Sequence, residues 1–321
     1  MESFSIVTYN ILADELSKIH DIPYSNKVRL QLLTAQLESF VASKSIICLQ
    51  EVSTAMYGSI TLWFEQHGYV IYGSTYAPNL GVVIAAPLGY VSRCEIVKLR
   101  DCKSWPRYGE ITWAQWITKC ISFGYYTPPT YSQWRNASYK NNLMVCVDIK
   151  NKYSIGTLHM PCSYKEPIVM QTYLSLARTA LTEFAGAKPC ILAGDFNIKP
   201  DTELYFEMLS GKFGCEDYET AYPSTDKWRP KNEDILLSAY KTMHKTEPAY
   251  TCFTATNKYQ AGFCGTLDYI LHTPNINILN CELVRTNKKD EPQPNQLEPS
   301  DHIPILATIE LVANNNYYAQ V

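Results

Sequence analysis

Residues 190–197 read CILAGDFN, a short apolar run followed by a glycine, an acidic residue, a phenylalanine and an amide. The apolar run predicts a buried strand, and the polar residues predict that it ends in a loop. Because residues two apart in extended backbone point to the same face, we expect Asp195 and Asn197 to meet one ligand. A carboxylate beside an amide suits phosphoryl chemistry: the first can orient water or hold a metal, and the second can donate to phosphate oxygens.

Length and composition are those of a globular chain. The 321 residues are 46% hydrophobic and 18% charged, which is enough for a sizeable core. A net charge of −3 excludes attraction of the whole chain to polyanions, so binding nucleic acid requires a local basic cleft or a bound cation. We expect one catalytic domain over residues 1–321, with a variable Trp-rich insertion at about 103–139 and a loose tail at about 313–321.

The eleven cysteines are irregularly spaced, and many lie in apolar runs. This pattern predicts small buried hydrophobes in a reducing compartment, without a disulfide framework or a zinc site. The first residues lack the pattern of a signal peptide, and no apolar run approaches the length of a membrane span. We therefore expect a cytoplasmic protein that does not contact a membrane.

Apolar periodicity predicts alternating strands and helices. Strands are expected at residues 4–9, 46–49, 69–72, 81–85, 143–149, 153–158, 190–193, 267–271 and 305–312, and helices at 26–42, 54–67, 167–184 and 201–209. Residues 217–246 and 286–301 are expected to be loops. No linker or repeat divides the chain, so the order of elements favours sheets at the centre with helices outside.

Polar residues end or interrupt several of these strands. They are Asn10, Glu51, His159, Asp195 with Asn197, Asp268, and Asp301 with His302. Each has a structural explanation on its own, such as a turn cap for Asn10 or an ion pair for Asp268. Together they are less easily explained, because a buried unpaired carboxylate costs several kcal/mol. Such a set of side chains implies a bound cation or a mutual network.

The order of these residues resembles a known superfamily. The motifs are YN at residues 9–10, LQEV at 49–52, the strand-end His159, GDFN at 194–197, LDY at 267–269 and SDH at 300–302. They occur in the order found in the endonuclease/exonuclease/phosphatase superfamily, over about residues 4–312. YNILA at 9–13 and GFCGTLDY at 262–269 are most similar to the deadenylase-like branch, which contains nocturnin, the Angel proteins and the exonuclease subunit of the Ccr–Not complex.

The resemblance implies a fold, a cofactor and a water-activating group. The fold is of the α/β class: a two-sheet α/β sandwich flanked by helices (DNase I-like), with the site at one rim of the sandwich. Glu51, helped by Asn10, would hold Mg²⁺, a hard cation that prefers oxygen ligands, with Mn²⁺ as a possible substitute. Asp195 would orient or activate the attacking water, and Asp301 would complete the acidic cluster.

The remaining implied roles concern the phosphate and the base. Asn197 would donate to the phosphate in the transition state. His302, oriented by Asp268, would contact the scissile phosphate, and His159 would bind it from the other side. Phe263, five residues before the Asp of LDY, would stack on adenine.

These roles imply a Mg²⁺-dependent 3′→5′ exoribonuclease of deadenylase type that acts on the 3′ adenylate end of RNA and releases 5′-AMP. The same chemistry on a 2′,5′- or cyclic-phosphate RNA end, a nucleotide cofactor or DNA is an alternative. A phosphoinositide or sphingomyelin phosphodiesterase fits less well, and an inactive binding module would have lost site residues.

Three departures from the branch bear on substrate and partners. The loop after His159 is shorter, and the Trp-rich insertion has no counterpart. No leucine-rich repeat module is expected, so docking to a large deadenylase complex through one is not expected either. The sequence leaves the oligomeric state open.

Overall fold

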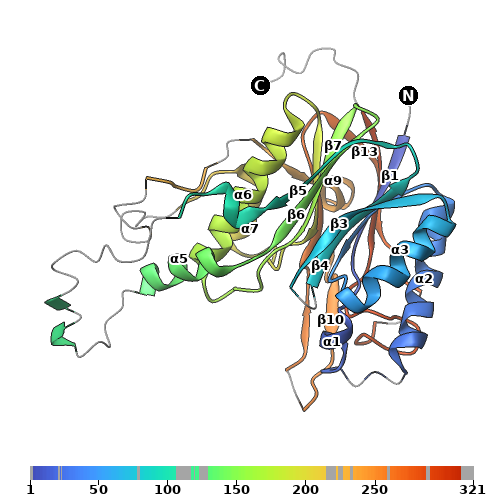
Figure 1. Ribbon diagram of the computed structural model, residues 1–321, viewed down its shortest axis with the longest axis horizontal. Coiled ribbons are helices and arrows are strands. Elements are labelled where there is room, and N and C mark those ends of the chain that lie inside the picture. Colours follow the sequence, from blue (N-terminus) through green and yellow to red (C-terminus); the bar gives the residue numbers. More distant parts are fainter. Residues whose placement is uncertain are drawn as a thin grey trace.

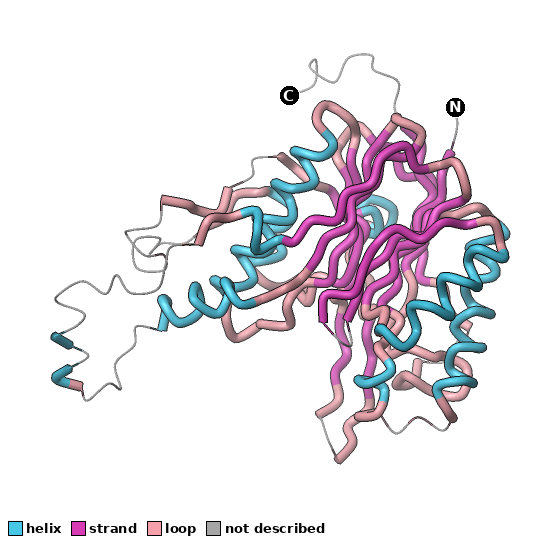
Figure 2. The backbone as a smooth tube through the Cα atoms, viewed as in Figure 1, coloured by secondary structure: helices cyan, strands magenta, loops and turns pink. Residues whose placement is uncertain are grey.

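Two six-stranded mixed sheets form the centre of the protein (Figures 1 and 2). The computed structural model describes residues 3–20, 22, 24–77, 80–105, 117–118, 120–122, 129–214, 222, 227–231, 234–258, 261–286 and 290–311. Apolar side chains from both sheets meet in one buried cluster between them. The expected two-sheet α/β sandwich is confirmed.

The first sheet has the strand order β13-β14-β1-β2-β4-β3. Its strands are β1 Ser3–Asn10, β2 Ile46–Gln50, β3 Tyr69–Ala77, β4 Leu80–Pro87, β13 Ile276–Leu283 and β14 Ile305–Leu311. Only β1 and β2 run parallel within it, with Asn10 opposite Gln50. Because parallel strands end at the same edge, Asn10 and the residue after Gln50 emerge together.

The second sheet has the order β5-β6-β7-β8-β12-β9. Its strands are β5 Val91–Lys98, β6 Leu143–Ile149, β7 Tyr153–His159, β8 Cys190–Asp195, β9 Leu237–Ser238 and β12 Asp268–His272. Strands β7 and β8 are parallel, with His159 opposite Asp195, and β12 is antiparallel to β8, with Asp268 opposite Asp195. Three polar residues therefore lie in one row across the sheet. A separate two-stranded ribbon joins β10 Cys252–Thr254 to β11 Phe263–Gly265.

Helices cover the outer faces of the sandwich (Figure 1). The first sheet packs against α2 Asn26–Ala42 and α3 Thr54–Gln66, and the second against α6 Pro167–Ala185, with α5 Pro129–Tyr139 and α7 Glu203–Ser210 beside it. Ser25 caps α2 by accepting from the Val28 amide, and Pro167 opens α6. The shorter helices are α1 Asp14–Ser17, η1 Leu99–Cys102 and α9 Ala239–His244. Among the described residues, every helix is too short or too polar to cross a bilayer.

The structure corrects the sequence expectations mainly at sheet edges. The edge strands β5 and β13 were not expected, because β5 is largely exposed and has no apolar alternation. The loop expected at 217–246 is wrong at its end, where β9 and α9 form. About half of the Trp-rich insertion, including Trp113 and Trp116, and the tail at 313–321 lie outside the described residues. Trp105 and Trp134 pack against the base of α6.

Candidate active site

Strand ends from both sheets meet at one rim, and Asn10 joins them. Its Nδ2 donates to Glu51 Oε1 at 3.0 Å and to Asp195 Oδ2 at 2.9 Å. Asn10 is fully buried, and Asp195 is 2% exposed. Two buried carboxylates, one from each sheet, therefore share a single amide group.

The backbone around Glu51 holds its carboxylate in place. Glu51 follows β2 in the left-handed region, at φ 58°, a conformation that costs roughly 1–3 kcal/mol for a non-glycine residue. Its Oε2 accepts from the Ala13 amide at 3.0 Å. Leu12, at φ 57°, turns the chain back and donates its amide to Asn10 Oδ1. Strained backbone on both sides thus aims Glu51 and Asn10 at each other.

Two imidazoles, those of His159 and His302, face the carboxylate of Asp195. His159 Nε2 lies 3.7 Å from Asp195 Oδ2 and 3.9 Å from Glu51 Oε1, and His302 Nε2 lies 3.8 Å from Asp195 Oδ2. The other oxygen of Asp195, Oδ1, accepts from the Asn197 amide at 2.9 Å. Asp195 Oδ2 is therefore surrounded by nitrogens of Asn10, His159 and His302.

His302 and Asp268 form a buried dyad. His302 Nδ1 lies 2.8 Å from Asp268 Oδ2, which also accepts from Thr251 Oγ1 at 2.6 Å. Burial raises the pKa of Asp268 to about 6, against the opposing effect of His302. Burial alone would lower the pKa of His302, but Asp268, Cys252 and Asp301 raise it well above its ordinary value. The pair therefore keeps a proton on His302 at neutral pH.

This donor set fits a hard divalent cation. Glu51, His159 and Asp195 each offer a ligand atom within 4.8 Å of the others, as do Asp195, Asp268 and His302. Asp268 Oδ1 is buried without a hydrogen-bond partner. One amide cannot neutralise Glu51 and Asp195, and such a charge excess is costly unless a cation offsets it. Glu51 and Asp195 could hold a metal through their carboxylate oxygens, and Asn10 positions both by donating from Nδ2.

A family model matches residues 7–302, and its description is Endonuclease/Exonuclease/phosphatase family. The chain belongs to this family. Carbon catabolite repressor protein 4 homolog 4 of Arabidopsis thaliana is 31% identical over 134 residues, covering 40% of this chain and 28% of that protein. Nocturnin of Drosophila melanogaster is 31% identical over 143 residues, covering 40% and 21%. 2′,5′-phosphodiesterase 12 of Mus musculus is 25% identical over 334 residues, covering 95% and 51%. The chain thus spans about half or less of these relatives.

Solved structures support the same fold. ANGEL2, a 2′,3′-cyclic phosphatase, in complex with adenosine-2′,3′-vanadate superposes with a TM-score of 0.69 at 18% identity, covering 96% of each chain. The human nocturnin catalytic domain gives 0.59 at 16% identity, covering 97% of this chain and 95% of that one. At these identities the likeness concerns the fold. The family and its deadenylase-like branch were both expected from the sequence, and both are confirmed.

Three residues singled out by the family motifs lie outside the hydrogen-bonded centre. Strand β8 ends at Asp195 and Asn197 has φ 52°, so the argument from strand alternation is wrong here. The Asn197 side chain donates to the Met160 carbonyl at 3.0 Å. Asp301 lies 3.7 Å from His20 Nε2. Phe263 is half-buried on the ribbon, with Lys199 Nζ 5.2 Å from its ring centroid.

Family motifs assigned no role to several residues that support the site. Thr251 binds Asp268, and Ser300 Oγ donates to the Asn10 carbonyl at 2.7 Å. Tyr76 OH lies 3.5 Å from His159 Nδ1. Buried Arg29 donates to the carbonyls of Ile11 and Pro299, which ties the loop after β1 to the loop before His302. These contacts join distant segments, so no local pattern marks them; an arginine on the apolar side of 26–42 was the one available signal.

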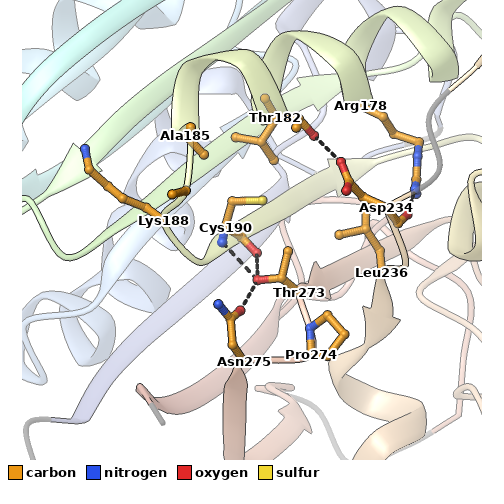
Figure 3. A pocket seen from close by; sticks show the side chains of 13 residues that line it. Arg178, Thr182, Ala185, Lys188, Cys190, Asp234, Leu236, Thr273, Pro274 and Asn275 are labelled. Atoms are coloured by element: carbon orange, nitrogen blue, oxygen red, sulfur yellow. Dashed lines mark hydrogen bonds between the residues drawn. The ribbon is translucent and has the colours of Figure 1, made fainter. Parts of the chain in front are cut away.

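A pocket of about 440 Å³ lies at the opposite end of β8 (Figure 3). Its lining includes Cys190, the first residue of β8, whereas Asp195 is the last. The two ends are about 17 Å apart at the usual rise of a strand. Thr273 Oγ1 accepts from the Cys190 amide and donates to Asn275 Oδ1, and Thr182 Oγ1 donates to Asp234. Hydrogen bonds within the lining occupy these polar groups, whereas Asp268 Oδ1 at the family site is buried without a partner.

Proposed function

We propose that the chain is a divalent-metal-dependent phosphodiesterase, a 3′→5′ exoribonuclease of deadenylase type that removes 3′ adenylates from RNA as 5′-AMP. One observation carries the proposal: Asn10 bridges the carboxylates of Glu51 and Asp195 while two imidazoles face Asp195 Oδ2. This combination of acidic oxygens and imidazole nitrogens suits a phosphodiester and attacking water.

In this proposal Glu51, helped by Asn10, would hold Mg²⁺, with Mn²⁺ as a possible substitute, and Asp195 would orient the attacking water. The bound metal would act as a Lewis acid that offsets charge on the phosphate oxygens. The carboxyl group of Glu51 is already held by the Ala13 amide at 3.0 Å, so little side-chain freedom would be lost on binding.

The chain's own residues would carry the proton and the phosphate. The water oxygen would attack phosphorus and pass a proton to Asp195, and the bond to the leaving 3′ oxygen would break, with that oxygen taking a proton from solvent. His302 and His159 would donate from Nε2 to phosphate oxygens, since both Nε2 atoms already lie within 4 Å of Asp195 Oδ2. Asp268 would keep His302 protonated and oriented.

Asn197 and Asp301 would have supporting roles. Asn197 would donate to the phosphate in the transition state after leaving the Met160 carbonyl. Asp301, 9% exposed and next to His302, would complete the acidic cluster. Both roles come from the family motifs, and both residues lie at the edge of the observed network.

Adenine recognition would depend on Phe263. Its ring lies on the ribbon that leads into Asp268, and it is half-buried rather than packed in the core. Lys199 beside the ring could contact a neighbouring phosphate. Base stacking on an aromatic ring contributes about 1–3 kcal/mol.

A second candidate keeps the chemistry and changes the RNA end. The relative that matches 95% of this chain is a 2′,5′-phosphodiesterase, and ANGEL2 is a 2′,3′-cyclic phosphatase. Hydrolysis of a 2′,5′ linkage or a cyclic phosphate would use the same attacking water and the same imidazoles. The ribose of the substrate would then present a different oxygen to the site.

A substrate panel tests the choice. The purified chain with Mg²⁺ would receive 5′-labelled RNA ending in A or U, 2′,5′-linked oligoadenylate, RNA ending in a 2′,3′-cyclic phosphate, DNA and nucleotide cofactors. We expect A-ended RNA to shorten fastest from its 3′ end. Equal rates on A and U ends would remove the role of Phe263, and faster cleavage of the 2′,5′ or cyclic substrate would favour the second candidate.

The proposal includes a cytoplasmic location. The ten cysteines in the described part of the chain are all free, as in a reducing compartment.

A further inference from the structure

Cys252 lies directly beside His302. The two residues form an isolated antiparallel bridge between β10 and the segment before β14. The flanking hydrogen bonds, Phe253 N to Asp301 O and Ile303 N to Thr251 O, make this a non-hydrogen-bonded pair. In such pairs the two side chains share a face and lie close together. A thiol is thereby held against the imidazole of the dyad.

Two more metal-binding side chains lie next to this pair. Cys252, Asp301 and His302 are buried, and each offers a ligand atom within 4.8 Å of the other two. His20 Nε2 lies 3.7 Å from Asp301 Oδ2, and its side chain is 7% exposed. Ligand atoms around a tetrahedral zinc lie about 3.3–3.8 Å apart, so the His20–Asp301 distance already fits. His20 approaches the group through Asp301 alone, so its imidazole would have to move toward Cys252 and His302 to complete a four-ligand site.

We propose that Cys252, Asp301, His302 and His20 form a second metal site, selective for Zn²⁺, whose occupation switches off the hydrolytic site. One thiolate, one carboxylate and two imidazoles are a zinc donor set, whereas Mg²⁺ prefers oxygen ligands. Spacing between cysteines gives no sign of such a site, because the β-bridge brings its ligands together from segments far apart in the sequence.

Zinc binding would remove His302 from the hydrolytic site. His302 holds Asp268 through Nδ1 and faces Asp195 through Nε2, so coordination of either nitrogen breaks one of these contacts. The thiol of Cys252 and the imidazolium of His302 each release one proton to solvent when the metal binds. The inhibition rests on the proposed function, but the binding of zinc does not.

The binding test uses Co²⁺ and Zn²⁺ on the full chain. Co²⁺ bound to a thiolate gives a charge-transfer absorption, and Zn²⁺ displaces it. We expect one equivalent to give this band in the wild type and in Cys94→Ser, a matched control at an exposed cysteine on β5. Cys252→Ser should lose the band, and Glu51→Gln should keep it, since Glu51 belongs to the other site.

A second variant distinguishes loss of the metal site from loss of folding. His20→Gln leaves the thiol in place, and we expect it to weaken Zn²⁺ binding by about tenfold or more. A band that persists in Cys252→Ser, no band in the wild type, or unchanged affinity in His20→Gln would overturn the site.

Inhibition is measured for each variant relative to its own rate in Mg²⁺ alone. Micromolar Zn²⁺ should suppress hydrolysis in the wild type and in Cys94→Ser, and it should suppress Cys252→Ser at least tenfold less. Equal inhibition of all three would overturn the switch. If no substrate is hydrolysed, the proposed function fails, while the Co²⁺ band still decides whether the zinc site exists.

Discussion

The two ends of β8 differ in how their charges are neutralised. At the Cys190 end, Lys188 Nζ lies 2.6 Å from Asp148 Oδ2, and Arg178 donates to the carbonyls of Met208 and Asp234. At the Asp195 end, Glu51 and Asp195 share the amide of Asn10, and Asp268 keeps an oxygen without a partner.

The difference shows why an open cavity is not by itself evidence of chemistry. The pocket at the Cys190 end is a cavity of about 440 Å³, yet hydrogen bonds and ion pairs within the fold occupy its polar groups (Figure 3). At the rim, the imidazolium of His302 compensates only part of the negative charge of the buried carboxylates of Glu51, Asp195 and Asp268. That excess is costly to folding and useful to a metal-assisted reaction.

Substitution at the Asp195 end should have the largest effect. Glu51→Gln keeps the size of the side chain and removes its charge, so we expect hydrolysis to fall about 10²–10⁴-fold with folding retained. Asp234→Asn at the pocket end is the matched control and should stay within about twofold of wild type. Hydrolysis rates and circular dichroism spectra of both variants check this. Similar losses of activity in the two variants would contradict the proposed difference between the two ends of β8.

The dyad gives the next largest effect. Asp268→Asn removes the carboxylate that orients and charges His302, and we expect hydrolysis to fall about 10²-fold, mainly in kcat. Substrate binding, measured with the RNA in Ca²⁺, should change much less. A large rise in KM with kcat intact would instead assign Asp268 to binding.

Base recognition gives a smaller and selective effect. Phe263→Ala should lower hydrolysis of A-ended RNA by about tenfold, within the range expected for one stacked base. Phe263→Tyr, which keeps a ring, should retain most of the activity. The ratio of kcat/KM for A-ended and U-ended RNA is the measurement, and a loss that is equal for both ends would argue against stacking.

Glu207 gives the smallest effect, on stability. This buried residue of α7 accepts from Gln171 Nε2 at 2.7 Å, and burial raises its pKa from 4.5 to about 7. Between these pH values the folded state binds more protons than the unfolded state, so this contribution to stability falls as pH rises. Glu207→Gln should therefore raise Tm relative to wild type at pH 8 and much less at pH 5. A difference that does not depend on pH would contradict the raised pKa.

The sequence predicted the sandwich because its central strands and helices have strong apolar patterns. The helix at 26–42 has the observed bounds of α2, and the strands that bear Asn10, His159 and Asp195 were all found. Edge strand β5 was missed because it is exposed along most of its length, and β13 was missed because its exposed face weakens the apolar signal. A single domain over residues 1–321 stays a prediction.

The candidate residues could be named from motifs, but their mutual geometry could not. Motif order does not reveal that one amide serves both Glu51 and Asp195, or that Thr251 holds Asp268. Those contacts depend on register between strands far apart in the chain. At Asn197 the prediction from the sequence failed, since its left-handed backbone ends the strand alternation that the sequence suggested.

The central claim is that the rim at Asp195 requires a divalent cation. The most direct measurement is the rate of hydrolysis of 5′-labelled A-ended RNA as free Mg²⁺ is varied with EDTA. The account predicts no hydrolysis in EDTA, recovery as free Mg²⁺ is restored, and no recovery in Glu51→Gln. Full activity in EDTA would contradict it.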